Sequence, residues 1–461
     1  MGNDVTLTSA VANDDIITPS AALSPSDTPF SPSDAVPGVV VDEPQAPARR
    51  SRWGLLRQHD FRQLFLADAG SQFGFQIGML ALPLVAAVTL HASPFEMGLV
   101  AAGDTVPFVI ATLPAGVIVD RVRRRPVMIA CDLGRMATLA VIPIAWLLGV
   151  LAIWQVILVA FMIGMFSAVF DVAYQSLLPS IVGKDEVIEG NSKLTGLGAV
   201  SQIAGPAASG WIIRALTPPF AVAVNAVTYL SSAAFLRRIR TPESAPERHP
   251  DRHMGREILE GLRYVAKQPV LRAIGLEASC MNFFNAIFNA MILYFMARNL
   301  HLSAGTIGFI LSVASLGGLA GALLASRVGT WIGTARVMWL LPLVTSPLWL
   351  VVPLMQRGPA LWWVAGAFTV IIFGGVIFNV TSVSFRQRLA PPHLLGRVNA
   401  TMRFLILSLM PLGALIGGAL GSTIGVRNAL WVGCIGGALS WLPAMFSPLR
   451  TMRNMPEPEP A

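Results

Sequence analysis

The stretch Gly116-Val117-Ile118-Val119-Asp120-Arg121-Val122-Arg123-Arg124-Arg125-Pro126 places five charged residues between two long apolar runs. A membrane helix needs about 20 apolar residues, and a basic cluster beside it stays on the cytoplasmic side. Glycine permits close helix approach, and an aspartate can pair with a helix end or an arginine. The stretch therefore predicts a cytoplasmic turn between two membrane helices, with Gly116, Asp120, Arg121, Arg124 and Arg125 as candidate gating residues.

The composition predicts an all-α integral membrane protein. Hydrophobic residues make up 54% of the 461 residues, charged residues 13%, and the mean hydropathy is +0.63. Soluble domains carry roughly 25% charged residues. Twelve apolar runs are long enough to cross a bilayer, at about 62–90, 96–119, 126–149, 152–175, 191–214, 219–236, 272–298, 305–328, 335–356, 360–384, 398–421 and 428–448.

The distribution of basic residues predicts the orientation. With the amino terminus inside, 28 of the 33 lysines and arginines fall on the cytoplasmic side of the twelve runs. The expected outer loops hold only Arg214, Arg298, Arg357 and Arg427. Because short cytoplasmic loops are enriched in lysine and arginine, both termini are expected in the cytoplasm of a bacterial cell, with the chain in the cytoplasmic membrane.

The longest charged interruption divides the runs into two sets of six. The expected organisation has five parts: an acidic, disordered tail (1–55), a six-helix bundle (56–236), a linker (237–271), a second six-helix bundle (272–449) and a short cytoplasmic tail (450–461). Within the linker, residues 255–267 have one apolar face and are expected to form an amphipathic helix on the membrane surface.

Several classes of function are disfavoured. The net charge of +8 is dispersed over inner loops, which favours an anionic lipid surface over nucleic acid. The three cysteines lie in separate apolar runs, so no disulfide framework is indicated. The six histidines lack metal-ligand spacing, and no phosphate-binding loop is present. The sequence therefore predicts that the protein is not an enzyme and binds no metal or cofactor.

The chain resembles the major facilitator superfamily, and within it the drug:proton antiporter branch of twelve-helix bacterial exporters. The resemblance covers about residues 55–450. It implies two six-helix bundles, a central cavity near the midplane and alternating access. Besides the 116–125 turn, it is carried by Ala67-Asp68 with Ser71, Gly74, Gln76 and Leu80-Ala81-Leu82-Pro83, by Asp132-Leu133-Gly134-Arg135, by Phe170–Ser176 with Leu178-Pro179, by Glu189–Leu194, by Gly205-Pro206 with Gly210, and by Arg386-Gln387 with Leu395–Ala400.

The chain also departs from that branch. Such exporters often have an acid in span 6, where this chain has Asn225, and small or neutral residues where this chain has Asp104 and Glu277. The second-half counterpart of the turn, residues 321–333, has Arg327 but no clear aspartate. Any gating latch is therefore expected to be asymmetric.

Ionisable groups inside a span are functional candidates because charge in hydrocarbon is costly unless paired or hydrated. Asp104, about nine residues into its span, is the first candidate for a carboxyl group that binds and releases a proton. The alternative is a structural carboxylate satisfied by Thr105 or a neighbouring helix. Glu277 and Asp68 are further proton-coupling candidates, although their depth also suits gate contacts with Arg121, Arg397 or Arg403. Arg397 joins the candidate gate.

Asp132 and Arg135 are three residues apart, which places them on one helical face. A self-neutralising pair is the least costly way to keep two charges in a span, so a packing or gating ion pair is the favoured interpretation. Asp171 lies near the end of its span and is expected to make gate contacts.

Polar residues at helical spacing supply candidate cavity residues. Asn282, Asn285 and Asn289 follow intervals of three and four and so form one stripe. The stripe either makes interhelical hydrogen bonds or lines a cavity with Phe283, Phe284 and Phe288. The remaining cavity candidates are Gln76, Gln202 and Asn225.

Gly205, Pro206 and Gly210 resemble the antiporter signature of exporters, in which tight packing and a proline bend form a pivot. The sequence thus predicts a monomeric secondary transporter that exports amphipathic small molecules such as drugs, siderophores or secondary metabolites in exchange for protons. The alternatives left open are a lysophospholipid or metabolite carrier of the same fold, and a transport-inactive receptor or accessory protein.

Overall fold

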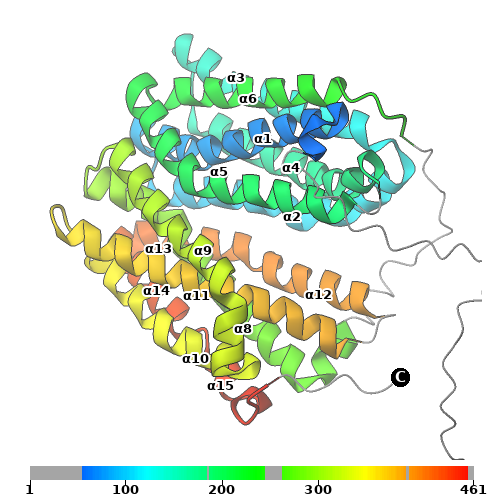
Figure 1. The fold of residues 1–461 in the computed structure, drawn as a ribbon. Helices are drawn as coiled ribbons and strands as arrows, with labels where there is room; N and C mark the ends of the chain where they lie inside the picture. The colour runs from blue at the N-terminus through cyan, green and yellow to red at the C-terminus, as the bar shows by residue number, and fades with distance from the viewer. Residues whose placement is uncertain (1–53, 184–185, 244–261, 391–393, 455–461) are drawn as a thin grey trace, which may run out of the picture. The chain divides into compact units, whose positions relative to one another are not determined.

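A computed structural model describes residues 54–183, 186–243, 262–390 and 394–454. The chain divides into residues 1–52 and 53–461, and every described residue belongs to the second part. The first half of this part is helical (Figure 1), with η1 (Leu55–Arg57), α1 (His59–Leu84), η2 (Val85–Thr89), α2 (Pro94–Arg121), α3 (Arg124–Leu147), α4 (Ile153–Ile181), α5 (Val187–Leu216) and α6 (Pro218–Arg237).

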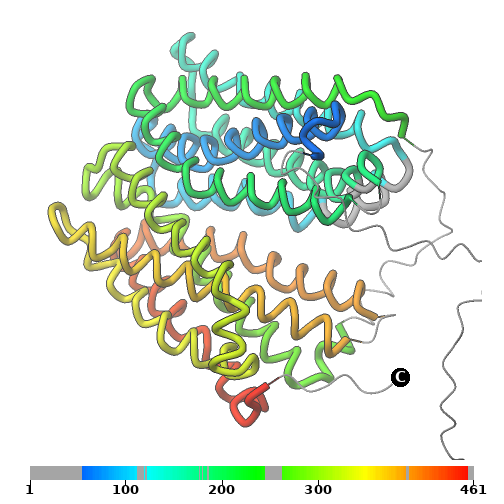
Figure 2. Tube along the Cα trace, viewed as in Figure 1, coloured from blue at the N-terminus to red at the C-terminus, as the bar shows by residue number. Residues whose placement is uncertain are grey.

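The second half repeats this arrangement with more interruptions. Its elements are α8 (Pro269–Tyr294), η4 (Phe295–Asn299), α9 (Ala304–Ile332), α10 (Thr334–Thr345), η5 (Ser346–Leu354), α11 (Ala360–Leu389), α12 (Leu395–Ser408), α13 (Met410–Thr423), α14 (Val426–Leu439), α15 (Leu442–Met445) and η6 (Pro448–Arg450). The trace in Figure 2 runs through one group of helices from blue to green before it enters the other, from yellow-green to red.

The all-helical membrane fold predicted from the apolar runs is confirmed, because helix occupies each of the twelve positions within the described residues. Ten of these helical segments are long and apolar enough to cross a membrane. The other two are α5, which carries Glu189, Lys193 and Arg214, and α14, which stops after 14 residues.

The structure adds breaks that the apolar runs did not predict. The ninth run changes from α10 to the 3-10 helix η5, where Pro347 and Pro353 remove backbone donors. The eleventh run is interrupted at Leu409, just before Pro411, so that α12 and α13 are separate helices. Breaks of this kind leave the hydropathy of a span unchanged.

Corresponding elements of the two halves have the same local geometry at an offset of 210 residues. Residues 85–89 and 295–299 each form a π-helix. Each leads into a Leu-His-X-Ser sequence in which the histidine has positive φ, 55° at His91 and 43° at His301. Ser93 and Ser303 then cap α2 and α9. This repetition is typical of transporters built from two parallel repeats.

Within each half the helices pack as a bundle. In the first, α6 packs against α1 and α3, and α4 against α2 and α3. In the second, α8 packs against α13 and α14, and α11 against α9. The bundles contact each other chiefly through α2 with α13 and α5 with α9.

Glycine makes these two inter-bundle contacts possible. A Cβ at Gly98 of α2 would lie 2.8 Å from the carbonyl oxygen of Ala414 and 2.8 Å from Cα of Gly418, both in α13. Gly308 of α9 lies directly on the Pro206 carbonyl of α5, and Gly210 of α5 on the Ala304 carbonyl of α9. We name the end of the helices near residues 90–93 and 300–303 the crossing end. Every inter-bundle contact made by a described glycine lies toward this end.

Parts of the expected organisation lie outside the described residues, namely residues 1–53 of the predicted tail 1–55 and most of the predicted amphipathic helix. Residues 262–267 at the end of that segment are helical, and Val265 packs with Leu271 and Val398. The side chains of Gly116, Asp120 and Arg121 are also outside the described part, although their backbone continues α2.

Gly308→Leu is expected to force α5 and α9 apart, because the added side chain meets backbone rather than a flexible side chain. Overpacking of this kind costs about 1–3 kcal/mol, so the melting temperature of the detergent-purified protein should fall. Gly366→Leu is the matched control, since no heavy atom lies within 4 Å of a Cβ at Gly366 in the described structure. Equal melting temperatures for the two variants would contradict the close crossing.

Candidate functional site

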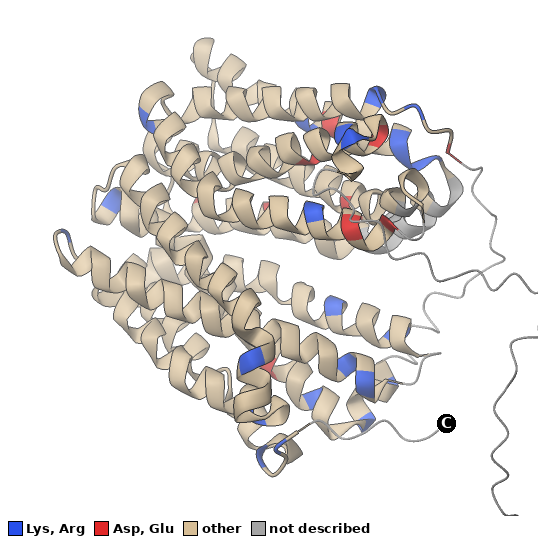
Figure 3. Cartoon of the chain, viewed as in Figure 1, with Lys and Arg blue, Asp and Glu red and all other residues tan. Residues whose placement is uncertain are grey.

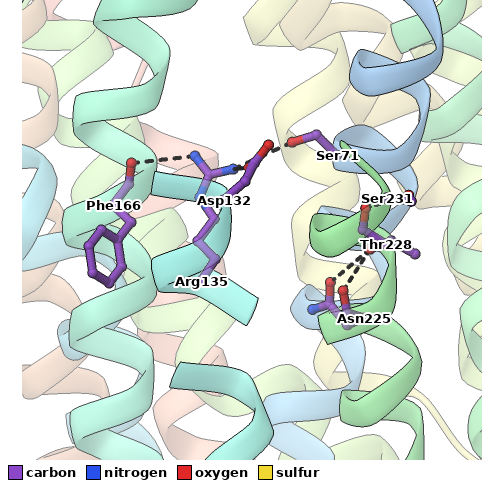
Figure 4. Close-up of polar contacts among 7 residues, drawn as sticks. All are labelled: Ser71, Asp132, Arg135, Phe166, Asn225, Thr228 and Ser231. Carbon is purple, nitrogen blue, oxygen red and sulfur yellow. Dashed lines mark hydrogen bonds and ion pairs between the residues drawn. The ribbon is translucent and has the colours of Figure 1, made fainter. Parts of the chain in front are cut away.

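The first bundle encloses a buried ion pair. Arg135 Nη1 lies 3.3 Å from Asp132 Oδ1, and the two side chains are 3% and 0% exposed (Figure 4). The guanidinium also donates to Ser71 Oγ at 3.4 Å and to the Phe166 carbonyl at 3.4 Å. It therefore joins α3 to α1 and α4.

Aromatic rings complete the surroundings of this guanidinium. Arg135 Cζ lies 4.3 Å from the centre of the Phe170 ring and 5.0 Å from that of Tyr229. A cation over a desolvated ring face is stabilised by the ring quadrupole. Asp132, Arg135, Phe170 and Tyr229 are together named the Arg135 cluster. Its burial suits the packing role expected of the pair.

Two more acids lie near the Arg135 cluster. Asp171 interacts electrostatically with Arg135 and also with Arg403 of α12 in the other bundle. Asp68 is 5% exposed and lies beside Tyr174 and Gln72. Tyr174 in turn stacks on Phe170, with ring centres 6.1 Å apart. Asp132 and Asp171 thus share one arginine, and Asp68 lies next to them through Tyr174.

Asp104 of α2 lies within electrostatic range of Tyr229 in the Arg135 cluster, but it is not part of the ion pair. Met97, Val100 and Ala111 share its helical face at intervals of four and seven residues, and all three are buried. Asp104 itself is exposed. Thr105, which could have satisfied it, donates instead to the Ala101 and Ala102 carbonyls. Within the described part of the chain, no side chain bonds to or pairs with the Asp104 carboxylate.

Glu277 is sealed inside the second bundle. Its side chain is 2% exposed, and Oε2 has no hydrogen-bond partner among the residues that the structure describes. On the helical wheel of α8 it shares a face with Phe284, which packs on Gly436 of α14. Glu277 therefore points into its own bundle and is not brought together with Asp104.

The asparagine stripe lies on another face of α8. Phe283 and Ile287 meet α13 through Gly413 and Gly417, and Phe284 meets α14. The asparagines therefore face neither helix. Asn289 Nδ2 donates to Asn285 Oδ1 at 2.5 Å, and Asn282 Nδ2 donates to the Ala278 carbonyl at 2.8 Å. Asn289 is exposed.

The glycine contacts also set the register between Asp104 and this stripe. Gly98 lies between Ala414 and Gly418 of α13. Gly413 of α13 contacts Phe283 of α8, so residues of these two helices that are level with each other differ in number by about 130. Asp104 is six residues, about 9 Å, farther from the crossing end. It is therefore level with the turn of α8 that begins the stripe.

The remaining three cavity candidates lie in different environments. Gln202 of α5 is exposed, whereas Gln76 of α1 donates to the Ser201 carbonyl at 3.1 Å and ties α1 to α5. Asn225 is 2% exposed and lies against Gly74 and Gly78 of α1, with Thr228 as its hydrogen-bond partner (Figure 4). Asn225 therefore acts as a packing residue between α6 and α1 in this structure.

The candidate pivot forms part of the contact between the bundles. Pro206 interrupts the hydrogen bonds of α5, and the Ala207 N–H next to it donates to Ser312 Oγ of α9 at 2.8 Å. Gly210 and Gly308 allow the two backbones to approach at the same place. The proline bend thus exposes a backbone donor that the opposite bundle satisfies.

The basic turn is held by the chain that follows α6. The Glu243 carboxylate accepts hydrogen bonds from the backbone N–H of Arg124 at 2.8 Å and of Arg125 at 3.2 Å. The Arg125 side chain donates to the Ile239 carbonyl. Arg397 is partly exposed at the start of α12. The α2–α3 turn and the start of α12 are at the end opposite the crossing end, where most of the described charges lie (Figure 3).

Sequence reasoning missed Tyr229, Tyr174 and Ser312. The spacing of Phe170 and Tyr174, four residues apart, could have indicated an aromatic face beside the arginine. Tyr229 comes from a helix far along the chain, and Ser312 is one of many membrane serines. No local signal marks these two residues.

The chain matches residues 50–459 to the family described as transmembrane secretion effector, and it belongs to that family of the major facilitator superfamily. The multidrug efflux pump Tap of Mycolicibacterium fortuitum is 27% identical over 350 residues, 73% of this chain and 83% of that protein. The enterobactin exporter EntS of Escherichia coli O81 is 23% identical over 381 residues, 80% of this chain and 87% of that protein.

Solved structures share the fold. A bacterial homologue of the iron transporter ferroportin in its inward-facing state superposes with a TM-score of 0.68 and 16% identity, covering 85% of this chain and 98% of that one. Its outward-facing state gives a TM-score of 0.55 and 17% identity, with coverage of 84% and 98%. The family match and the efflux relatives show that the chain is a bacterial efflux-type transporter, embedded in the inner membrane and acting on small molecules.

Asp132→Ala is expected to destabilise the protein by about 3–5 kcal/mol, because Arg135 would remain buried without a counter-charge. The double variant Asp132→Asn/Arg135→Gln should recover much of this loss, since neither residue is then charged. Chemical unfolding of the purified protein in detergent measures both. A double variant no more stable than Asp132→Ala would show that the two side chains do not act as a pair.

Proposed function

We propose that this protein is a monomeric proton-coupled exporter of amphipathic small molecules, with Asp104 as its proton-coupling carboxyl group. The observation that carries the proposal is the exposed Asp104 side chain on a helical face where Met97, Val100 and Ala111 are buried. A carboxylate in the middle of a span and without a described partner is tolerable only if water or substrate reaches it. Asp104 is therefore assigned to the central cavity, opposite the asparagine stripe.

The proposed orientation has both termini in the cytoplasm and the crossing end outside. The distribution of lysine and arginine supports it, because the end opposite the crossing end carries most of the basic residues. The linker 237–271, the tail 450–461 and the basic 116–125 turn are then cytoplasmic.

In this orientation the structure corresponds to an inward-facing state. The glycine contacts of α2 with α13 and of α5 with α9 close the outer side. The higher TM-score against the inward-facing ferroportin homologue is consistent with this assignment. Export then requires these contacts to separate, while Asp171 and Arg403, already in electrostatic range, come together on the inner side.

The proposed substrates are lipophilic compounds that carry at most one positive charge. Asp104 supplies a single negative charge, and Asn285, Asn289 and Gln202 supply neutral hydrogen-bonding groups. Arg135 is bonded to Asp132 and covered by two rings, so it is not free to bind an anionic substrate. The names of the relatives, a multidrug efflux pump and an enterobactin exporter, are consistent with export of such molecules.

Asp104→Asn is expected to reduce substrate-driven proton movement about tenfold or more, because the amide cannot bind the coupled proton. Proteoliposomes with an internal pH dye and a panel of lipophilic cations, macrolides and phenicols provide the measurement. Asp104→Glu is the matched control and should keep proton movement, since it retains a carboxyl group. Wild-type proton movement in Asp104→Asn would reject this assignment.

The proposed orientation makes a separate prediction. A cysteine at Val150, in the α3–α4 loop, should react with a membrane-impermeant maleimide added to intact spheroplasts. A cysteine at Arg388, at the far end of α11, should react only after permeabilisation. Both positions are exposed, so access to the reagent depends on the side of the membrane. The reverse labelling pattern would show that the orientation is opposite to the one proposed.

A further inference from the structure

The loop between α1 and α2 holds His91 in a fixed conformation. Its φ of 55° is in the left-handed region, which is uncommon for residues other than glycine and is adopted most often by asparagine, aspartate and histidine. Hydrogen bonds from Leu90 N–H to the Val85 carbonyl at 3.0 Å and from Ala92 N–H to the Ala86 carbonyl at 2.9 Å close the loop on both sides of His91. The imidazole is therefore presented from a defined backbone position.

His91 reaches across to the second bundle. Its Nδ1 lies 3.0 Å from Arg298 Nη1 of η4. A guanidinium can only donate, so Nδ1 must accept and must be unprotonated for this hydrogen bond to exist. Together with the Ala207–Ser312 bond, this contact joins the two bundles among the described residues.

The surroundings offer little compensation for a second positive charge. Glu96, in the first turn of α2, accepts hydrogen bonds from Ser93 N–H at 2.7 Å and Ser93 Oγ at 2.9 Å, which commits it to the helix cap. It is the only acid at the crossing end within the described ranges. The other charges at this end are arginines: Arg214 over Trp211, Arg357 on the Leu300 and His301 carbonyls, and Arg427 over Phe295.

We infer that His91 is a proton-binding site on the crossing-end contact, and that its protonation favours separation of the two bundles there. Protonation removes the acceptor of the Arg298 hydrogen bond and places two cations in contact. Histidine is suited to this because its charge changes between about pH 5 and 8. The inference rests on the proposed function only for the compartment from which the proton comes, which is the cell exterior in the proposed orientation.

The second half of the chain provides an internal control. His301 has the same backbone conformation and the same place in the repeat. The residue that corresponds to Arg298 in the first half, 210 positions earlier, is the uncharged Val88. The contacts described near His301 use its carbonyl oxygen rather than its ring. Protonation of His301 therefore has no equivalent consequence for the bundle contact.

The test is a distance measurement between spin labels on the two bundles at the crossing end. Labels are placed at Val150→Cys and Ile424→Cys in a full-length chain in which Cys131, Cys280 and Cys434 are replaced, and distances are recorded in nanodiscs at pH 7.5 and 5.5. The contact is exposed and exposed charge contacts are weak, so acidification should raise the open-to-closed ratio about fivefold.

His91→Asn should abolish this pH response, because asparagine accepts the left-handed conformation and does not titrate. Arg298→Gln should abolish it as well, since no like charge then faces the imidazole. His301→Asn should retain the full response. A pH response that persists in both His91→Asn and Arg298→Gln, or a wild-type distance that does not change with pH, would overturn the inference.

These outcomes are independent of those for the proposed function. The distance measurement requires no substrate and no proton gradient. If Asp104→Asn continued to move protons while His91→Asn lost the distance response, the proton-coupling assignment would fail and the gate inference would stand. The opposite pair of results would reject the gate inference and leave Asp104 in place.

Discussion

The two bundles are held together by backbone contacts that only glycine permits. Helices in lipid gain no hydrophobic driving force from association, so close van der Waals packing and hydrogen bonds must supply the attraction. Gly98 and Gly418 provide this packing between α2 and α13, and Gly210 and Gly308 provide it between α5 and α9. These contacts are made largely by backbone atoms, with the Ala207–Ser312 hydrogen bond beside them, and we propose that they separate and re-form during transport.

The second constraint is the cost of charge in the membrane. In the first bundle this cost is offset at Arg135, because Asp132, the Phe166 carbonyl and two aromatic rings surround the guanidinium. Glu277 lies in the interior of the second bundle, 2% exposed and with no hydrogen-bond partner for Oε2 among the described residues. Asp104 is neither part of an ion pair nor buried, and this difference separates it from Asp132 and Glu277. This difference is the reason for proposing Asp104, rather than the other acids, as the charge that meets the transported species.

The twelve-helix fold was predictable from the sequence because hydropathy and basic-residue placement act locally. The Asp132–Arg135 spacing also indicated a pair, since three residues along a helix bring side chains together. The sequence could not indicate that Asn225 packs against Gly74 and Gly78, or that Glu277 faces α14, because helix rotation depends on neighbours far along the chain. Tyr229 and Ser312 act through partners on other helices for the same reason. The breaks at η5 and Leu409 depend on prolines whose effect on a membrane helix varies with its surroundings.

Reversible separation of α5 from α9 is the central claim, and a disulfide across that contact tests it most directly. The Ala207 N–H and Ser312 Oγ are 2.8 Å apart, so cysteines at Ala207 and Ser312 should be close enough to bridge. In a chain with its three native cysteines replaced, oxidation should stop substrate transport in proteoliposomes and reduction should restore it. Full transport by the oxidised, cross-linked protein would contradict the claim that this contact opens during the cycle.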